Sequence, residues 1–213
     1  MSFTADPPAN DSAIATPFVI TAELVAQDKI IVGEPKFQDE LRTRGFGEKE
    51  ISEYLLRPYE ALYLIHTKRL ALRRAKHRGT SENEDVGSAR EKELDFDSLF
   101  KIVMKHDKNI LTKFLIYRDL RSRGYVTKEG FGFGADFRVY DRGDFEKKPA
   151  KYVVFGINEG TKIKASRFSG TIEQIEKMGK EAVIAVIERR GEIIYYKACK
   201  MRFAVNRNNI TII

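Results

Sequence analysis

The stretch YRDLRSRGYVTKEGFGFGADFRVY, residues 117–140, decides the fold of the C-terminal half of this chain. It opens on the end of a helix that the apolar spacing predicts over 109–123. Gly124 stands where helices commonly end on a left-handed residue, so we expect the helix to end there. Aromatic and β-branched residues then predict strands at 125–127 and 137–140, joined by a turn rich in glycine.

Further elements are expected on both sides of this stretch. In the helix, Leu111, Phe114 and Leu115 recur at spacings of three and four and predict one buried stripe. Downstream we expect a strand at 152–155, a helix at 170–178 capped by Ser169 or Thr171, and strands at 182–187 and 193–198 joined by a turn at 188–191. Upstream we expect strands at 18–20 and 30–32, a short segment at 37–44, a helix at 48–56, an apolar strand or helix at 59–65, and a helix at 95–105 capped by Asp95 or Asp97.

This mixture of helices and strands predicts an α+β fold in two modules. The expected division is a disordered tail at 1–17, an N-terminal mixed α/β domain at 18–108 and a C-terminal domain at 109–213. The C-terminal domain is expected to have a mixed central sheet flanked by helices.

Composition narrows the class of protein. The chain has 213 residues, with 38 lysines and arginines against 31 aspartates and glutamates, so its formal net charge is +7. A basic chain is attracted to polyanions such as nucleic acids, although a merely soluble basic surface explains the charge equally well. One cysteine and three scattered histidines exclude a disulfide framework and a confident metal cluster. No apolar run approaches the ~20 residues that span a bilayer, and 1–17 lacks the character of a secretory signal.

A run of basic residues without acids lies between residues 65 and 80. It holds Lys68, Arg69, Arg73, Arg74, Lys76 and Arg78. Each one alone is most simply part of a solvated helix face. The cluster as a whole favours contact with phosphates or with an acidic partner surface.

The string at 117–140 also carries a specific resemblance. With its continuation through 151–154 and 182–196, it closely resembles the C-terminal catalytic domain of the archaeal tRNA-intron (splicing) endonucleases. The upstream strings LRTRGFG at 41–47 and YEALYL at 59–64 are similar to that family's N-terminal domain. The resemblance implies a nuclease-like C-terminal domain, precursor tRNA as substrate, a cytoplasmic location, and no metal or other cofactor.

The resemblance also implies a reaction. The family cleaves RNA with the substrate's own 2′-hydroxyl as nucleophile and leaves a 2′,3′-cyclic phosphate and a 5′-hydroxyl. Such a reaction needs a base for the 2′-hydroxyl, an acid for the leaving oxygen and a cation for the charge that builds on phosphorus. The family uses a tyrosine, a histidine and a lysine. The resemblance places the tyrosine at Tyr140 and the lysine at Lys180, although each is also an ordinary residue for the end of a strand.

The histidine is missing. Its position falls on Pro149, which Ala150 follows, and no histidine occurs after His106. Proline has no proton to give. Because a general acid or base typically contributes ~10²–10⁴-fold to the rate, we expect this chain by itself to be nearly inactive.

The turn at 188–192 is a second departure from the family. In active members this turn is acidic and enters a basic pocket of a neighbouring subunit, whereas here Arg189 and Arg190 would repel such a pocket. We therefore expect the chain to supply the receiving pocket, with the basic cluster described above or five further residues as candidates. Those five, which are also our candidates for contact with RNA, are Lys147, Lys148, Lys162, Lys164 and Arg167.

Apolar strands near the C-terminus predict pairing with another chain, since exposed sheet edges are usually covered. The interface candidates are Arg189, Arg190, Ile193, Tyr195, Phe203 and Val205. Both departures favour a non-catalytic, structural subunit that assembles with a catalytic paralogue, as an α2β2 tetramer. One alternative is an active subunit that uses Tyr140 and Lys180 with another group or water as acid. A second alternative is a basic RNA-binding module without endonuclease assembly.

Overall fold

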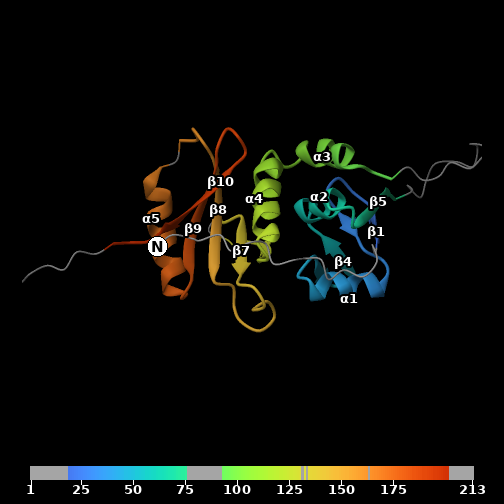
Figure 1. Ribbon diagram of the computed structural model, residues 1–213, viewed down its shortest axis with the longest axis horizontal. Coiled ribbons are helices and arrows are strands. Elements are labelled where there is room, and N and C mark those ends of the chain that lie inside the picture. Colours follow the sequence, from blue (N-terminus) through green and yellow to red (C-terminus); the bar gives the residue numbers. More distant parts are fainter. Residues whose placement is uncertain (1–18, 76–92, 131, 133, 163, 202–213) are drawn as a thin grey trace, which may run out of the picture.

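The computed structural model shows two domains side by side along the long axis, with helix α4 (Ile110–Ser122) between them (Figure 1). The structure describes residues 19–75, 93–130, 132, 134–162 and 164–201, without the side chains of 165 and 167. The predicted tail at 1–17, the basic residues Lys76 and Arg78, and the interface candidates Phe203 and Val205 lie outside the described residues. No helix in the described ranges combines the length and apolar character that crossing a membrane requires.

The N-terminal domain holds a five-stranded mixed sheet in the order β3-β4-β2-β1-β5. Its strands are β1 (Ile20–Leu24), β2 (Ile30–Ile31), β3 (Glu48–Glu50), β4 (Glu53–Leu56) and β5 (Leu70–Arg74). β1 and β5 run parallel and the other pairs antiparallel. The part of the basic run that the structure describes therefore lies partly on an edge strand, not on the expected helix face.

The helix expected at 48–56 is wrong, because this segment forms the hairpin β3–β4. Tyr54 and Leu56 are buried alternately along β4, which is a strand pattern. Ile51 turns the chain with a φ of 49°. Gly47 precedes the hairpin with a φ of 62°, and a Cβ there would lie 2.5 Å from the Tyr54 ring. The chain therefore enters a hairpin after the tightly packed Gly47, where the sequence predicts the first turn of a helix.

Three helices complete the N-terminal half: α1 (Pro35–Thr43), α2 (Pro58–His66) and α3 (Phe96–Met104). The segments expected at 37–44 and 59–65 correspond to α1 and α2, and both helices begin on a proline, which suits the first helical turn. The helix expected at 95–105 corresponds to α3. Asp95 is its cap, because the carboxylate accepts a hydrogen bond from the Ser98 backbone N–H at 2.9 Å.

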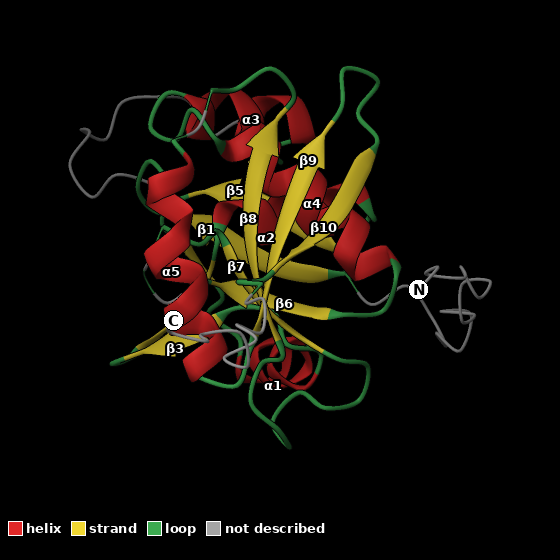
Figure 2. Cartoon of the chain, turned by 90° about the vertical axis from the view of Figure 1, so that its left-hand side faces the viewer, coloured by secondary structure: helices red, strands yellow, loops and turns green. Residues whose placement is uncertain are grey.

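The C-terminal domain holds a second five-stranded sheet, in the order β10-β9-β8-β7-β6. Its strands are β6 (Val126–Glu129), β7 (Phe137–Tyr140), β8 (Tyr152–Asn158), β9 (Glu181–Ile187) and β10 (Ile193–Ala198). β8 and β9 run parallel, and every other pair is antiparallel. Helix α5 (Ala165–Lys177) covers one face and α4 covers the other (Figure 2). The expected α+β fold with a mixed, helix-flanked sheet is confirmed.

Two details of these helices differ from expectation. α5 begins at Ala165 rather than near 170, and its cap position is Lys164, so neither Ser169 nor Thr171 caps it. Leu111 is 51% exposed. The fully buried positions of α4 instead include Ile110, Ile116 and Tyr117, because this helix is covered both by its own sheet and by α2 of the other domain.

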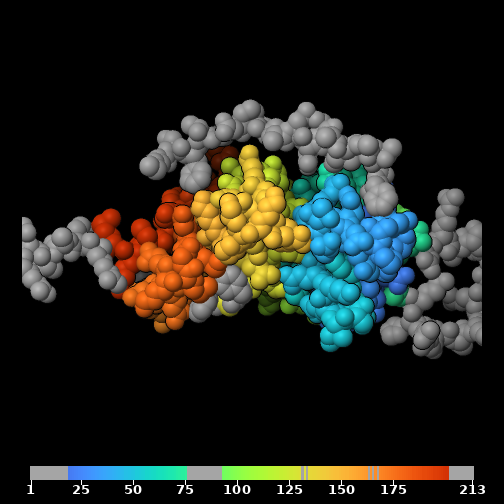
Figure 3. Space-filling view, turned by 90° about the horizontal axis from the view of Figure 1, so that it is seen from below, coloured from blue at the N-terminus to red at the C-terminus, as the bar shows by residue number. Residues whose placement is uncertain are grey.

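An aromatic cluster joins the two domains where α2 packs on α4. The Tyr59 ring lies 5.0 Å from Tyr117 and 5.2 Å from Phe137, and the Tyr63 ring lies 5.6 Å from Tyr117. These rings belong to a single buried core that runs from β1 to β9. Figure 3 shows the two domains in broad contact. The domains therefore share one hydrophobic core and form one body.

A buried ionic group crosses the same interface. The Glu60 carboxylate, on α2, accepts hydrogen bonds from the backbone N–H groups of Gly47 and Arg57, both at 3.0 Å. Lys128, on β6, donates to the Gly47 carbonyl. The two side chains are 1% and 5% exposed. Burial raises the pKa of Glu60 and lowers the pKa of Lys128, since desolvation outweighs their mutual attraction. Each charged form is therefore destabilised by burial and stabilised by the opposite charge of the other side chain.

Partly exposed ion pairs lie around this buried group. Arg57 binds Glu129 at 2.8 Å, and Arg138 binds Glu48 at 3.0 Å. Each pair joins a residue of the N-terminal domain to a residue of the C-terminal domain. Ion pairs that are open to solvent contribute little to the free energy of unfolding. We therefore infer that these pairs orient the two domains rather than hold them together.

Replacing Lys128 with methionine tests the buried group. We expect Lys128→Met to lower the free energy of unfolding by about 3 kcal/mol, because it leaves the Glu60 charge buried without its cation. The double variant with Glu60→Gln should lose less than the single variant, since no charge then remains inside. Chemical denaturation measures both, with exposed Lys49→Met as the control at under ~0.5 kcal/mol. A double variant less stable than Lys128→Met alone would contradict this account.

Candidate functional site

The register of three strands brings the sequence-predicted catalytic positions to one end of the C-terminal sheet, which we call the Tyr140 end. Val139 pairs with Tyr152, and Tyr152 pairs with Glu181. The Lys151 N–H donates to the Val139 carbonyl, and the Glu181 N–H donates to the Lys151 carbonyl, both at 2.9 Å. Tyr140 therefore ends β7 at the place where Ala150 leads into β8 and Lys180 leads into β9.

The side chains at this end are held by local contacts. Tyr140 is half-buried, and its ring meets the Phe145 ring edge-on at 5.2 Å. The Lys180 ammonium donates to the Ala150 carbonyl at 2.7 Å. Pro149, the residue before Ala150, is exposed. The tyrosine and lysine positions thus flank a middle position that has no side-chain donor.

The histidines do not replace that donor. His66 ends α2, and its ring packs on Phe96 and Phe114 at 6.2 and 6.1 Å. Phe114 lies about two turns of α4 away from the Tyr140 end. His106 follows α3 in the other half of the chain, and His77 lies outside the described residues. Neither described histidine therefore lies at this end of the sheet.

Four of the five residues predicted to contact RNA fall at two opposite ends of the sheet. Lys147 and Lys148 lie in the loop between β7 and β8, at the Tyr140 end, where Lys148 binds Asp144 at 3.0 Å. Lys162 and Lys164 lie between β8 and α5, at the end where β8 finishes, which we call the Asn158 end. The Arg167 side chain lies outside the described part of the chain.

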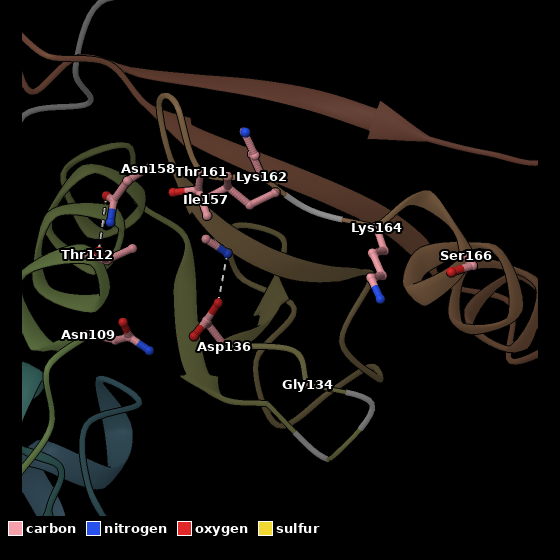
Figure 4. Close-up of a pocket in the computed structure, with 11 residues that line it drawn as sticks. Asn109, Thr112, Gly134, Asp136, Ile157, Asn158, Thr161, Lys162, Lys164 and Ser166 are labelled. Atoms are coloured by element: carbon pink, nitrogen blue, oxygen red, sulfur yellow. Dashed lines mark hydrogen bonds between the residues drawn. The ribbon is translucent and has the colours of Figure 1, made fainter.

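A cavity of about 630 Å³ opens at the Asn158 end (Figure 4). It lies between the start of α4, the turn before β7, the end of β8 and the segment before α5. Its lining is mostly polar: Asn109, Thr112, Gly134, Asp136, Gly156, Ile157, Asn158, Thr161, Lys162, Lys164 and Ser166. In Figure 4 the Lys164 side chain reaches toward the side of Asp136 and Gly134, whereas Lys162 points away from them.

Close packing of α4 on β8 shapes the wall of this cavity. A Cβ on Gly156 would lie 2.6 Å from the Ile116 side chain and 3.1 Å from Thr112. The Asp136 carboxylate accepts the Gly156 N–H at 2.7 Å, and the Thr112 hydroxyl donates to the Asn158 side-chain oxygen at 3.2 Å. The Asn158 amide nitrogen remains as a donor. Asp136 and Asn158 were not predicted from the sequence, because only the fold brings these distant positions together.

The interface candidates also lie on described elements. Arg189 and Arg190 are exposed in the turn between β9 and β10, and the Arg189 N–H donates to Glu159 at 3.0 Å. β10 is an edge strand of the sheet. Its most exposed apolar residues are Ile194 and Tyr196, at 37% and 52%. By contrast Ile193 and Tyr195 are half-buried, and the Tyr195 hydroxyl donates to Asp119 at 2.8 Å.

Comparison with known proteins agrees with this architecture. Residues 110–195 match the family model described as tRNA intron endonuclease, catalytic C-terminal domain, and residues 21–84 match the tRNA intron endonuclease N-terminal domain. The chain belongs to the tRNA intron endonuclease family. This membership confirms the resemblance read from the string at 117–140.

Two relatives from archaea illustrate the similarity. The tRNA-splicing endonuclease of Methanococcus vannielii is 28% identical over 172 residues, which cover 81% of this chain and 89% of the relative. The tRNA-splicing endonuclease of Thermococcus onnurineus is 31% identical over 160 residues, which cover 75% of this chain and 84% of the relative. The similarity therefore extends over both domains.

Two glycines offer a test of the cavity wall. We expect Gly156→Ala to destabilise the protein by about 1–3 kcal/mol, because the new methyl group would press on Ile116. Gly170→Ala, within α5, meets no atom within 4 Å and should stabilise by about 0.5–1 kcal/mol through its helix propensity. Thermal and chemical unfolding measure both. The same sign for the two variants would show that α4 does not lie so close to β8.

Proposed function

We propose that this chain is the structural, scaffold subunit of a tRNA-splicing endonuclease, which excises introns from precursor tRNA at bulge-helix-bulge motifs. The observation that carries the proposal is Pro149 at the middle of the Tyr140 end, between the positions that the family resemblance gives to tyrosine and lysine. Proline can neither give nor take a proton. Among the described residues, the position between Tyr140 and Lys180 therefore supplies no proton to the leaving 5′-oxygen.

The contacts of Lys180 support the same proposal. Its ammonium is engaged with the Ala150 carbonyl at 2.7 Å. One of the donors of this ammonium is thereby used to hold the backbone at Ala150. We infer that Lys180 here fixes the segment that leads into β8. Cleavage, with its cyclic phosphate and 5′-hydroxyl products, then belongs to a catalytic paralogue.

Two surfaces suit assembly with such a paralogue as an α2β2 tetramer. The edge strand β10 presents Ile194 and Tyr196, and an unpaired edge of this kind favours strand pairing. The cavity at the Asn158 end has Lys162 and Lys164 at its rim. Within the described residues neither lysine has a carboxylate within ion-pairing distance. An acidic turn of the paralogue would find there both cations and polar donors.

A cleavage assay tests the scaffold role. We expect the purified chain alone to leave bulge-helix-bulge RNA intact, and the reconstituted complex to cleave it. In that complex Tyr140→Phe and Lys180→Ala should leave the cleavage rate unchanged, with Pro149→Ala as a matched control at the same end of the sheet. A loss of about ten-fold or more for Tyr140→Phe, with an unchanged melting temperature, would instead assign catalysis to this chain.

Charge reversal tests the receiving cavity. We expect the double variant Lys162→Glu, Lys164→Glu to weaken binding of the paralogue at least about ten-fold, because like charges at an interface cost several kcal/mol. The double variant Lys147→Glu, Lys148→Glu makes the same charge change at the Tyr140 end and should bind normally. Sedimentation of the mixed chains gives both affinities. Equal weakening by the two variants would mean that net charge, not this cavity, drives assembly.

A further inference from the structure

Arg142 is held in a fixed position beside the Tyr140 end. Its Nε donates to the Arg123 carbonyl, at the end of α4, at 2.7 Å. Gly124 makes room for it, since a Cβ on that residue would lie 3.2 Å from the Arg142 Nε. The guanidinium carbon lies 6.0 Å from the centre of the Tyr125 ring. The side chain is therefore ordered before any ligand arrives.

This arrangement leaves the outer part of the guanidinium for a ligand. With Nε engaged, both terminal amino groups of Arg142 remain as donors on an exposed side chain. In the part of the chain that the structure describes, no carboxylate lies within ion-pairing distance of it. Its basic neighbours differ, because Arg123 binds Asp119 at 2.8 Å and Lys151 binds Asp141 at 3.0 Å. Arg142 thus carries a charge that, within the described residues, no carboxylate compensates.

Two tyrosines form the floor beneath these cations. The rings of Tyr125 and Tyr152 are half-buried and meet edge-on at 6.3 Å. Lys151 lies over the Tyr152 ring at 4.9 Å, as Arg142 lies over Tyr125. We call these four residues the tyrosine strip. It lies on the α4 face of the sheet, where Tyr125 and Tyr152 pack against the core that α4 completes.

The strip reaches the Tyr140 end directly. Arg142 is two residues beyond Tyr140, and Lys151 follows Ala150, the residue that accepts the Lys180 hydrogen bond. We propose that the tyrosine strip binds the backbone of RNA, with Arg142 as a bidentate ligand of one phosphate. This proposal rests on the proposed function, because it takes its RNA from the splicing complex. It adds that the scaffold chain itself holds substrate at this surface.

The chemistry of the strip favours RNA over an acidic protein surface. A phosphodiester presents two non-bridging oxygens to the fork of an arginine, which binds such groups in bidentate geometry. Unpaired bases stack on aromatic rings and on arginine guanidinium planes, and the half-buried tyrosines lie directly beneath Arg142 and Lys151. An acidic peptide would use the cations but would gain less from the aromatic floor.

Binding of a labelled bulge-helix-bulge RNA to the full chain, measured over a range of salt concentrations, tests the proposal. We expect Arg142→Gln to weaken binding about ten-fold or more and to reduce the slope of log affinity against log salt by about 1. Arg142→Lys should keep the slope, because the charge remains. It should still bind RNA more weakly, because lysine lacks the two parallel donors of the guanidinium group. Lys177→Gln, on α5 at the other face of the sheet, should change neither quantity.

A structural role for Arg142 would lower the melting temperature without moving the salt slope. Arg142→Lys remains informative if Arg142→Gln folds poorly, since a lysine can still donate to the Arg123 carbonyl. Wild-type affinity and slope in Arg142→Gln would overturn the proposal, as would failure of the wild-type chain to bind the RNA. Loss of paralogue binding with intact RNA binding would assign the strip to an acidic protein surface and overturn it too. The scaffold function itself stands or falls on the cleavage and assembly assays.

Discussion

Helix α4 is buried on two sides, and the arrangement of the molecule depends on that constraint. One side packs on the C-terminal sheet, and the other receives the tyrosines of α2 from the N-terminal domain. A helix that serves two cores cannot shift without disturbing both, because protein interiors are close-packed. The start of α4 therefore fixes the cavity at the Asn158 end, and its last turn fixes the backbone that holds Arg142. Both proposed binding surfaces take their geometry from this one element.

The elements of the C-terminal domain were predicted from the sequence more completely than those of the N-terminal domain. The string at 117–140 predicted the end of α4 and the strands β6 and β7, because each boundary has its own local signal in a glycine or a run of β-forming residues. The hairpin β3–β4 escaped prediction because its many glutamates suggest a helix, while the contacts that favour strands come from Gly47 and the core. Leu111 was misjudged because the spacing of apolar residues does not show which of two partners covers a helix.

The candidate site also contains residues that could be predicted from the sequence and residues that could not. Tyr140, Pro149 and Lys180 could be named from the resemblance, and strand register then brought their positions together. The cavity could not be foreseen, since Asn109, Asp136 and Asn158 are distant in sequence and meet only through the packing of α4 on β8. Arg142 gave no signal of its own, because its distinction from other arginines lies in what holds it. Preorganisation by a backbone carbonyl and a glycine is a property of the fold, not of residue type.

The length of β8 sets the distance between the two proposed binding surfaces. β8 has seven residues, and its last three line the cavity. Four residues of extended chain, about 13 Å at the usual rise per residue, therefore separate the start of β8 beside Lys180 from the cavity. That distance exceeds the reach of any side chain, so the two proposed ligands would contact different residues at opposite ends of the sheet. In the two proposals taken together, β8 sets the spacing between the RNA and the paralogue.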